Sequence, residues 1–167
     1  DIMPLSGNLI ASTGYQDGYV YFSTPMSFKN GNSSIAVYDT NGTILWSWHI
    51  WSSAEGWNDH VYKNNAGTMM DRNLGATSAT PGSVGALGLL YQWGRKDPFM
   101  GSSDISISTV AISLGTWKTV SGSQTVDYAI ENPMTYITDT DGDWCSNAWD
   151  NYEIRWKESE KSLYDPC

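Results

Sequence analysis

Alternation of apolar and polar residues in the first third of the chain predicts antiparallel strands. Residues 19–23 alternate in this way and follow a glycine-bearing turn over residues 14–18. Residues 34–38 and 43–51, both rich in β-branched and aromatic side chains, flank the pair Asn41-Gly42. This pair favours the positive φ angles of a type I′ turn, so the pattern predicts a β-hairpin that turns there.

The second arm of this hairpin has no fully polar face. Alternation divides its side chains into two sets, Trp46, Trp48 and Ile50 on one side and Leu45, Ser47, His49 and Trp51 on the other. A strand that is apolar on both sides is expected to be central or covered on both faces. His49 is therefore expected to be a hydrogen-bonded interior residue rather than a metal ligand or a general base.

The rest of the chain predicts shorter elements. A strand is expected around residues 68–70, and apolar residues three to four positions apart predict a short helix over residues 83–93. The two glycines inside that helix favour close packing over helix propensity. Residues 101–122 are rich in Ser, Thr and Gly and suit an exposed loop or a weak edge hairpin. Residues 123–130 predict a second helix, which the following Asn-Pro pair would end, and residues 134–137 predict a strand.

Composition describes a folded, acidic protein. A chain of 167 residues suits one domain or at most two small ones, and 40% hydrophobic with 16% charged residues excludes disorder driven by charge. Nine Lys and Arg against eighteen Asp and Glu give a net charge of −9, which would repel nucleic acid and anionic lipid. No apolar run approaches the roughly 20 residues of a membrane span.

Tryptophan and tyrosine are unusually frequent. The chain has nine Trp and ten Tyr against three Phe, and Ser, Thr, Asn and Gly replace charged residues as the polar filler. This composition is typical of extracellular β-rich domains and of sites that stack on sugars or pack into protein interfaces, although such rings also fill cores. If tryptophans bind the ligand, the candidates are those expected in loops or at strand ends, namely Trp51, Trp57, Trp117, Trp144 and Trp149.

An acidic segment is the sharpest metal candidate. Asp139, Asp141 and Asp143 alternate as the carboxylates of an EF-hand-type loop do, and Asp150 falls at the twelfth position, where such loops carry their last ligand. Trp144 occupies the position where the loop needs Gly. The segment is therefore either a Ca²⁺ site, in which the cation offsets carboxylate repulsion, or a solvated acidic turn.

Enzymatic interpretations find little support. The sequence contains no His-Glu-x-x-His, Cys-x-x-Cys, phosphate loop or Gly-x-Ser-x-Gly elbow. Glu55 and Asp59 are a carboxylate pair of the kind that glycosidases use, but nothing in the sequence favours that role. We therefore expect a non-catalytic protein.

Several segments together resemble a known family. GTILWSWHIW (42–51), MDRNLGATS (70–78), GLLYQWGRKDPF (88–99), ENPMTYIT (131–138) and KSLYDPC (161–167) look like successive blocks of the major-paralogous-domain (FISUMP-like) proteins of gut Bacteroidetes. Those proteins are secreted or surface-anchored and often fimbrial. The family is similar to C-type-lectin-like domains, so the resemblance implies an α+β fold of mostly antiparallel strands with short helices and long loops.

The resemblance also implies a domain organisation. Residues 1–167 would form a single surface-protein domain, with a β-rich N-terminal part over 1–60 and a lectin-like part over 61–167. The family pattern continues beyond the Tyr-Asp-Pro-Cys block, so the domain would be incomplete at its C-terminus. Cys167 could then bridge to Cys145 in an oxidising compartment or to a cysteine in the missing part. Trp93, Gly94, Arg95 and Asp97 would be architectural, with Arg95 paired to carboxylates or carbonyls beneath the loops.

Three functions follow from these observations. The first is a binding or adhesion module at the bacterial cell surface or outside the cell, with a glycan or a host or pilus protein as its partner. The second is a structural pilus or envelope subunit, which should expose a strand edge or a large apolar patch. The third is a carbohydrate-active enzyme, which needs two carboxylates facing each other across a cleft.

Overall fold

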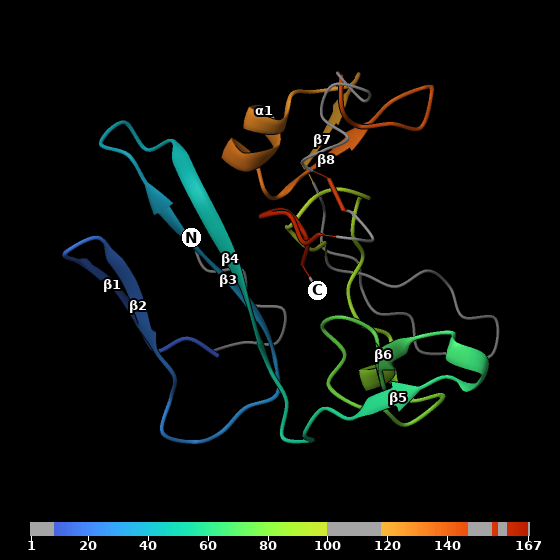
Figure 1. Ribbon diagram of the computed structural model, residues 1–167. Helices are drawn as coiled ribbons and strands as arrows, with labels where there is room; N and C mark the ends of the chain where they lie inside the picture. Colours follow the sequence, from blue (N-terminus) through green and yellow to red (C-terminus); the bar gives the residue numbers. More distant parts are fainter. Residues whose placement is uncertain (1–8, 100–117, 147–154, 157–159, 167) are drawn as a thin grey trace.

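The computed structural model describes residues 9–99, 118–146, 155–156 and 160–166 (Figure 1). In this part of the chain the strands form four pairs, β1 (Ser12–Gln16) with β2 (Tyr19–Ser23), β3 (Gly31–Tyr38) with β4 (Ile44–Ser52), β5 (Asp59–Val61) with β6 (Thr68–Met70), and β7 (Lys118–Ser121) with β8 (Thr135–Thr138). The first three pairs are antiparallel and the last is parallel. The described residues contain one α-helix, α1 (Val126–Glu131), and short 3₁₀ helices at Lys63–Asn65 and Val84–Ala86. The fold of this part is therefore mostly β with little helix.

The β3–β4 hairpin lies where the sequence predicts it. The turn expected over residues 14–18 is wrong for 14–16, which belong to β1 and pair with β2, so the N-terminal part also forms a hairpin and its turn is of type I′. Asp17 and Gly18 connect β1 to β2 and have φ angles of 51° and 85°. In the β3–β4 turn only Gly42 has a positive φ, and the Asp39 carboxylate accepts hydrogen bonds from the backbone N–H groups of Asn41 and Thr43, both at 2.8 Å. The prediction of a type I′ turn at Asn41-Gly42 is wrong because the Asp39 side chain stabilises a wider loop.

Strand β4 has packing contacts on both faces without being a central strand, although Leu45 and Trp48 stay exposed. Its strand partner among the described residues is β3 alone. Ile50 packs with Ile35 against a small core that includes Leu9, Ile10 and Val20. The other face meets the loops that precede residue 99, where the Ser47 hydroxyl donates to Asp97 at 2.6 Å.

The helix predicted over residues 83–93 does not form beyond the 3₁₀ turn at Val84–Ala86, so that prediction is wrong. Gly88 has a φ of 71°, and Leu89 N–H donates to the Leu74 carbonyl at 2.8 Å rather than to a helical partner. A Cβ on Gly88 would lie 2.8 Å from the same Leu74 oxygen. The glycines do permit close packing, as expected, but they pack two loops together.

Helix α1 and strand β8 confirm the predictions for residues 123–130 and 134–137. The Thr125 hydroxyl caps α1 by accepting from Tyr128 N–H at 3.1 Å. Residues 122–134 connect β7 to β8, and this length matches the crossover of a dozen or more residues that a parallel pair requires. Most of residues 101–122, for which the sequence left two interpretations, lies outside the described residues.

Arg95 connects the loop that precedes residue 99 to helix α1 and strand β8 through hydrogen bonds. Its side chain is buried, and Nη1 donates to the Gln92 side-chain oxygen and the Thr135 carbonyl, both at 2.8 Å. Nη2 lies 3.2 Å from the Asn132 carbonyl and 3.4 Å from those of Ala129 and Pro133. The architectural role expected of Arg95 is confirmed, with carbonyls as the main partners.

Hydrogen bonds also cross between residues 1–60 and 61–167. The Asn32 side chain donates to the Gly75 carbonyl at 2.8 Å, and the Trp51 indole donates to the Ala76 carbonyl at 3.0 Å. The two parts of the chain therefore share an interface along β3 and β4. Across the described residues, no helix combines the length and apolar character that spanning a membrane takes.

Candidate functional site

Two of the tryptophans assigned to binding meet at the end of β4. Trp51 lies near the end of that strand, and the loop that follows turns back to bring in Trp57, so that the ring centroids are 4.2 Å apart with a tilt of 52°. The hydrogen bond from the Trp51 indole to the Ala76 carbonyl holds the inner ring. The outer residue, Trp57, is 47% exposed. The solvent-exposed Trp57 ring therefore packs against the Trp51 ring, whose position is fixed by a hydrogen bond.

Arg72 clamps this aromatic pair, a role that the sequence did not predict. Its guanidinium carbon lies 5.4 Å from the Trp57 ring centroid, within cation–π range. Nε donates to Asp71 at 2.7 Å, Nη2 donates to the Gly56 carbonyl at 3.0 Å, and Nη1 lies 3.5 Å from Glu55. The sequence signal for this role was the Asp-Arg pair at residues 71–72, but only the folded chain brings that pair beside the tryptophans.

The charges of the site sum to a small negative value. Hydrogen bonds from Arg72, together with one from Asn58, lower the pKa of Asp71 to about 2. Glu55 keeps half of its side chain exposed and accepts from the Ala79 N–H at 3.2 Å. Two carboxylates and one guanidinium give the site a net charge of −1. Trp51, Glu55, Trp57, Asp71 and Arg72 are called the Trp57 cluster below.

The other assigned tryptophans do not join this cluster. Trp144 is 5% exposed, packs with Ala129 and Ile137, and donates its indole N–H to the Trp93 carbonyl at 2.7 Å. The prediction that Trp144 stacks on a ligand is wrong because its ring completes a core. Trp117 and Trp149 lie outside the described residues.

The acidic segment forms a turn in which the Asp139 and Asp143 carboxylates accept hydrogen bonds from other groups of the protein. Asp139 accepts from the backbone N–H groups of Asp141 and Ser123, which lower its pKa. Asp143 accepts from Arg155 Nη1 and from Cys145 N–H, both at 3.0 Å. Within the described ranges, no three His, Cys, Asp or Glu side chains are grouped as a metal site, and Asp150 lies outside those ranges. Calcium binding at Asp139, Asp141, Asp143 and Asp150 stays a prediction.

The cysteine pairing also stays a prediction. Cys145 is buried beside Trp144, whereas Cys167 lies outside the described residues.

His49 is an interior, hydrogen-bonded residue, as expected. The Asn32 amide nitrogen donates to Gly75, so the Asn32 oxygen faces His49 and accepts from its Nε2 at 2.8 Å. The Tyr91 hydroxyl lies 3.4 Å from the other ring nitrogen. Burial lowers the pKa of His49 to about 4, so the ring is neutral at neutral pH.

No protein-family model, curated protein or solved structure matches this chain.

Proposed function

We propose that this chain is a non-catalytic binding module of a cell-surface or fimbria-associated protein and that it binds a neutral carbohydrate at the Trp57 cluster. One observation carries the proposal: the half-exposed Trp57 ring is backed by Trp51 and clamped by Arg72. A ring that is already held loses little conformational entropy when a ligand stacks on it. An exposed ring without such support would bind less well.

The charged side chains beside Trp57 favour a neutral sugar as the ligand. The apolar face of a pyranose covers an indole, and the exposed Glu55 carboxylate can accept a hydrogen bond from a sugar hydroxyl. The Arg72 guanidinium already donates to several protein oxygens and acts as a clamp rather than as an anion receptor. A site with a net charge of −1 on a chain of −9 disfavours sialic and uronic acids.

The location and the fold family rest on the resemblance. The blocks shared with the major-paralogous-domain proteins support a secreted or surface-anchored module related to C-type-lectin-like domains. Mostly antiparallel strand pairs, a six-residue helix and long irregular connections are compatible with that family.

The proposal is tested on a glycan array with the full chain and two matched variants. Trp57 and Trp93 are 47% and 45% exposed, so Trp57→Ala and Trp93→Ala remove rings of similar accessibility. We expect binding to neutral glycans to weaken at least tenfold in Trp57→Ala and to persist in Trp93→Ala. Equal affinity of the two variants, or the absence of any bound neutral glycan, would contradict the proposal.

A chelator separates this site from the acidic segment. Stacking on an indole needs no cation, so binding at the Trp57 cluster is expected to persist in EDTA. Glycan binding that EDTA abolishes and Trp57→Ala leaves intact would instead place the ligand at the segment around Asp139.

A further inference from the structure

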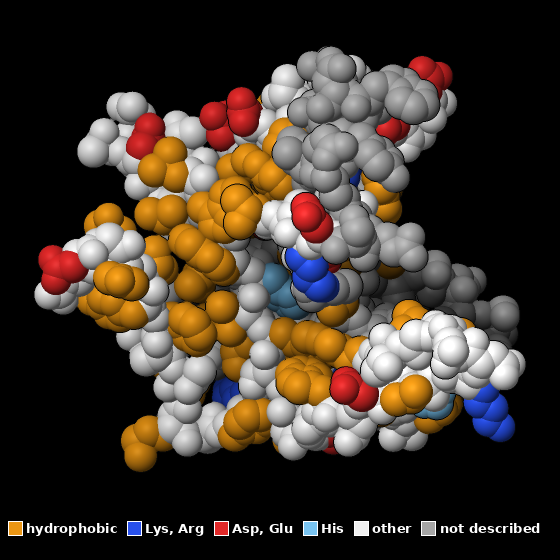
Figure 2. Space-filling model, in the orientation of Figure 1, with side chains coloured by type: hydrophobic (Ala, Val, Ile, Leu, Met, Phe, Trp, Pro, Cys, Tyr) orange, Lys and Arg blue, Asp and Glu red, His pale blue; other side chains and the backbone are white. Residues whose placement is uncertain are grey.

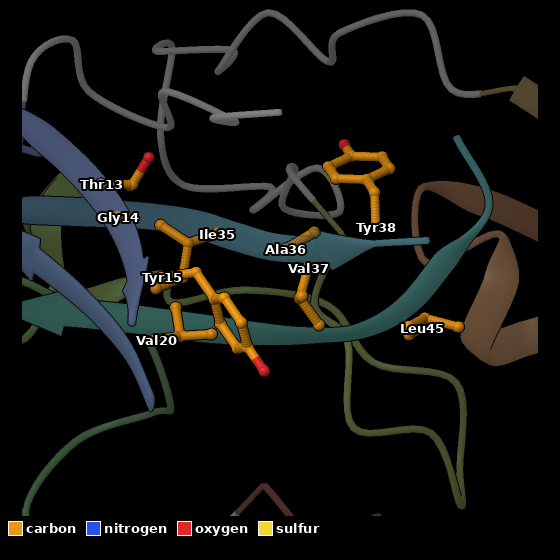
Figure 3. Close-up of a pocket in the computed structure, with 9 residues that line it drawn as sticks. All are labelled: Thr13, Gly14, Tyr15, Val20, Ile35, Ala36, Val37, Tyr38 and Leu45. Atoms are coloured by element: carbon orange, nitrogen blue, oxygen red, sulfur yellow. The ribbon is translucent and has the colours of Figure 1, made fainter. Parts of the chain in front are cut away.

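A groove of about 540 Å³ opens between the β1–β2 and β3–β4 hairpins (Figure 3). Val20 and Ile35 contribute to its lining and also pack against the core around Leu9. Tyr15 and Leu45, which lie nearer the hairpin turns, also line the groove and are more than half exposed. Figure 2 shows hydrophobic side chains gathered over these two hairpins. This surface is called the hairpin groove.

The hairpin groove follows the edges of two strands. Consecutive residues line it, 13–15 of β1 and 35–37 of β3. Because neighbouring side chains in a strand point to opposite faces, a consecutive run indicates that the groove touches the edge of the strand as well as one face. Within the described residues β1 pairs with β2 alone and β3 with β4 alone, so each strand has a second edge without a strand beside it.

Among the described residues, these edges carry little of the usual protection against a further strand. Natural proteins guard exposed edges with charged side chains, especially Lys, or with Pro, bulges or covering segments. None of β1, β2, β3 and β4 contains Asp, Glu, Lys or Arg. The β3–β4 pairing has a bulge between Val37 and Tyr38, at the end of the groove-lining stretch of β3, so residues 35–37 are the regular part of that edge. An uncharged apolar groove along open strand edges is typical of a surface that another polypeptide covers.

The charges around the groove indicate what kind of segment fits. Between residues 9 and 54 the charged residues are Asp17, Lys29 and Asp39. Both acids lie in the hairpin turns, at the more exposed end of the groove, whereas Lys29 precedes β3 at the opposite end. A second copy of this chain would bring the same acids and a further net charge of −9, so it is the poorer partner.

We propose that the hairpin groove binds an extended segment of a partner polypeptide that alternates apolar side chains, carries a Lys or Arg flank and adds a strand beside β3. Main-chain hydrogen bonds along the edge would provide affinity, and the apolar lining and the acidic turns would select the sequence. The stretch over residues 35–38 spans about 13 Å, room for about four residues of partner strand. This interaction goes beyond carbohydrate binding and uses a different surface.

The test selects peptides from a displayed library of random 12-residue sequences on the full chain. Counter-selection uses Leu45→Asn, which removes an exposed apolar side chain from the groove. The matched control is Met69→Asn, because Met69 is 60% exposed against 54% for Leu45 and lies on β6. Enriched peptides are then synthesised and their dissociation constants measured by fluorescence anisotropy.

We expect the enriched peptides to alternate apolar residues beside a basic flank. Their dissociation constants should rise at least tenfold in Leu45→Asn and less than twofold in Met69→Asn. Asp17→Asn keeps a pair suited to the type I′ turn, so it should fold normally and weaken binding of these peptides at low salt but not in 0.5 M salt. Circular dichroism confirms that each variant is folded.

Three results would overturn the proposal. The first is that no peptide is enriched, or that the same peptides bind Leu45→Asn equally well. The second is that acidic peptides are preferred. The third is sedimentation of the wild-type chain as a dimer that Leu45→Asn dissociates, which would make a second copy the occupant.

Discussion

At the scale of single residues, buried polar side chains acquire their properties from partners far away in the chain. Asn32 and His49 belong to opposite strands of one hairpin, yet the orientation of the Asn32 amide depends on the carbonyl of Gly75. That orientation in turn decides which His49 nitrogen carries the proton. A polar residue on an apolar strand is therefore predictable as interior, as His49 was, but its protonation depends on the surrounding structure.

His49 makes stability depend on pH. Burial lowers its pKa from 6.5 to about 4, so folding favours the neutral ring. The stabilisation that this shift represents is present above pH 6.5 and is lost as the pH falls to 4, a loss of about 3 kcal/mol. We predict that urea unfolding of the wild type between pH 7 and pH 4 shows this loss in excess of that in His49→Gln, which retains a donor to Asn32. Parallel pH profiles for the two proteins would contradict the prediction.

At the scale of elements, turn chemistry decided how each segment is connected. Asp17-Gly18 and Asn41-Gly42 are similar pairs, but Asp39 adds side-chain hydrogen bonds to the second and widens its loop. The glycines at residues 85 and 88 were expected to pack closely, and they do so within loops instead of a helix. The β3–β4 hairpin and α1 were predictable because their signals are local. The contacts that decide the conformation of residues 74–89 are not local, and β1 was missed because Gly14 and Gly18 suggested a turn.

Two glycines with the same backbone conformation provide a matched test. Gly18 and Gly94 have φ angles of 85° and 86°, but a Cβ on Gly18 would meet nothing within 4 Å, whereas one on Gly94 would lie 2.8 Å from Cγ of Arg155. Gly18→Ala should therefore lower the free energy of unfolding by about 1–2 kcal/mol from the left-handed backbone alone. Gly94→Ala should cost about 1–3 kcal/mol more, because the methyl group displaces Arg155. Urea denaturation measures both, and equal losses would show that Arg155 moves freely.

At the scale of the whole molecule, small cores are joined by buried polar contacts. One core packs Leu9, Ile10 and Ile35, and another packs Ala129, Ile137 and Trp144. Between them lie Ser47, Asp97 and Arg95, all buried and hydrogen-bonded. Counted over the described residues, both clusters are small, so the buried polar contacts are expected to contribute much of the cooperativity of unfolding.

Substitution of Arg95 tests most directly how much these buried polar contacts stabilise the protein. Burial lowers its pKa to about 10, so the guanidinium is still charged at neutral pH and donates to several carbonyls. Arg95→Met should lower the free energy of unfolding by about 3–5 kcal/mol because it removes the guanidinium donors from several buried backbone carbonyls. Arg95→Lys should lose somewhat less, since an ammonium group reaches fewer of them. Lys118→Met, at an exposed position on β7, is the control and should change little; a similar loss in Lys118→Met and Arg95→Met would contradict the prediction.

The sequence by itself determined several local elements: β2, the β3–β4 hairpin, α1, β8 and the interior position of His49, because alternation, capping and turn residues act over a few neighbouring positions. It also identified Trp51 and Trp57 as candidates for the same kind of role. Only the tertiary structure decided that Arg72 lies beside them, that Trp144 is buried, that β7 pairs with β8 in parallel, and that open strand edges border the hairpin groove. Each of these depends on contacts between residues far apart in the chain, whose free energies no local pattern contains.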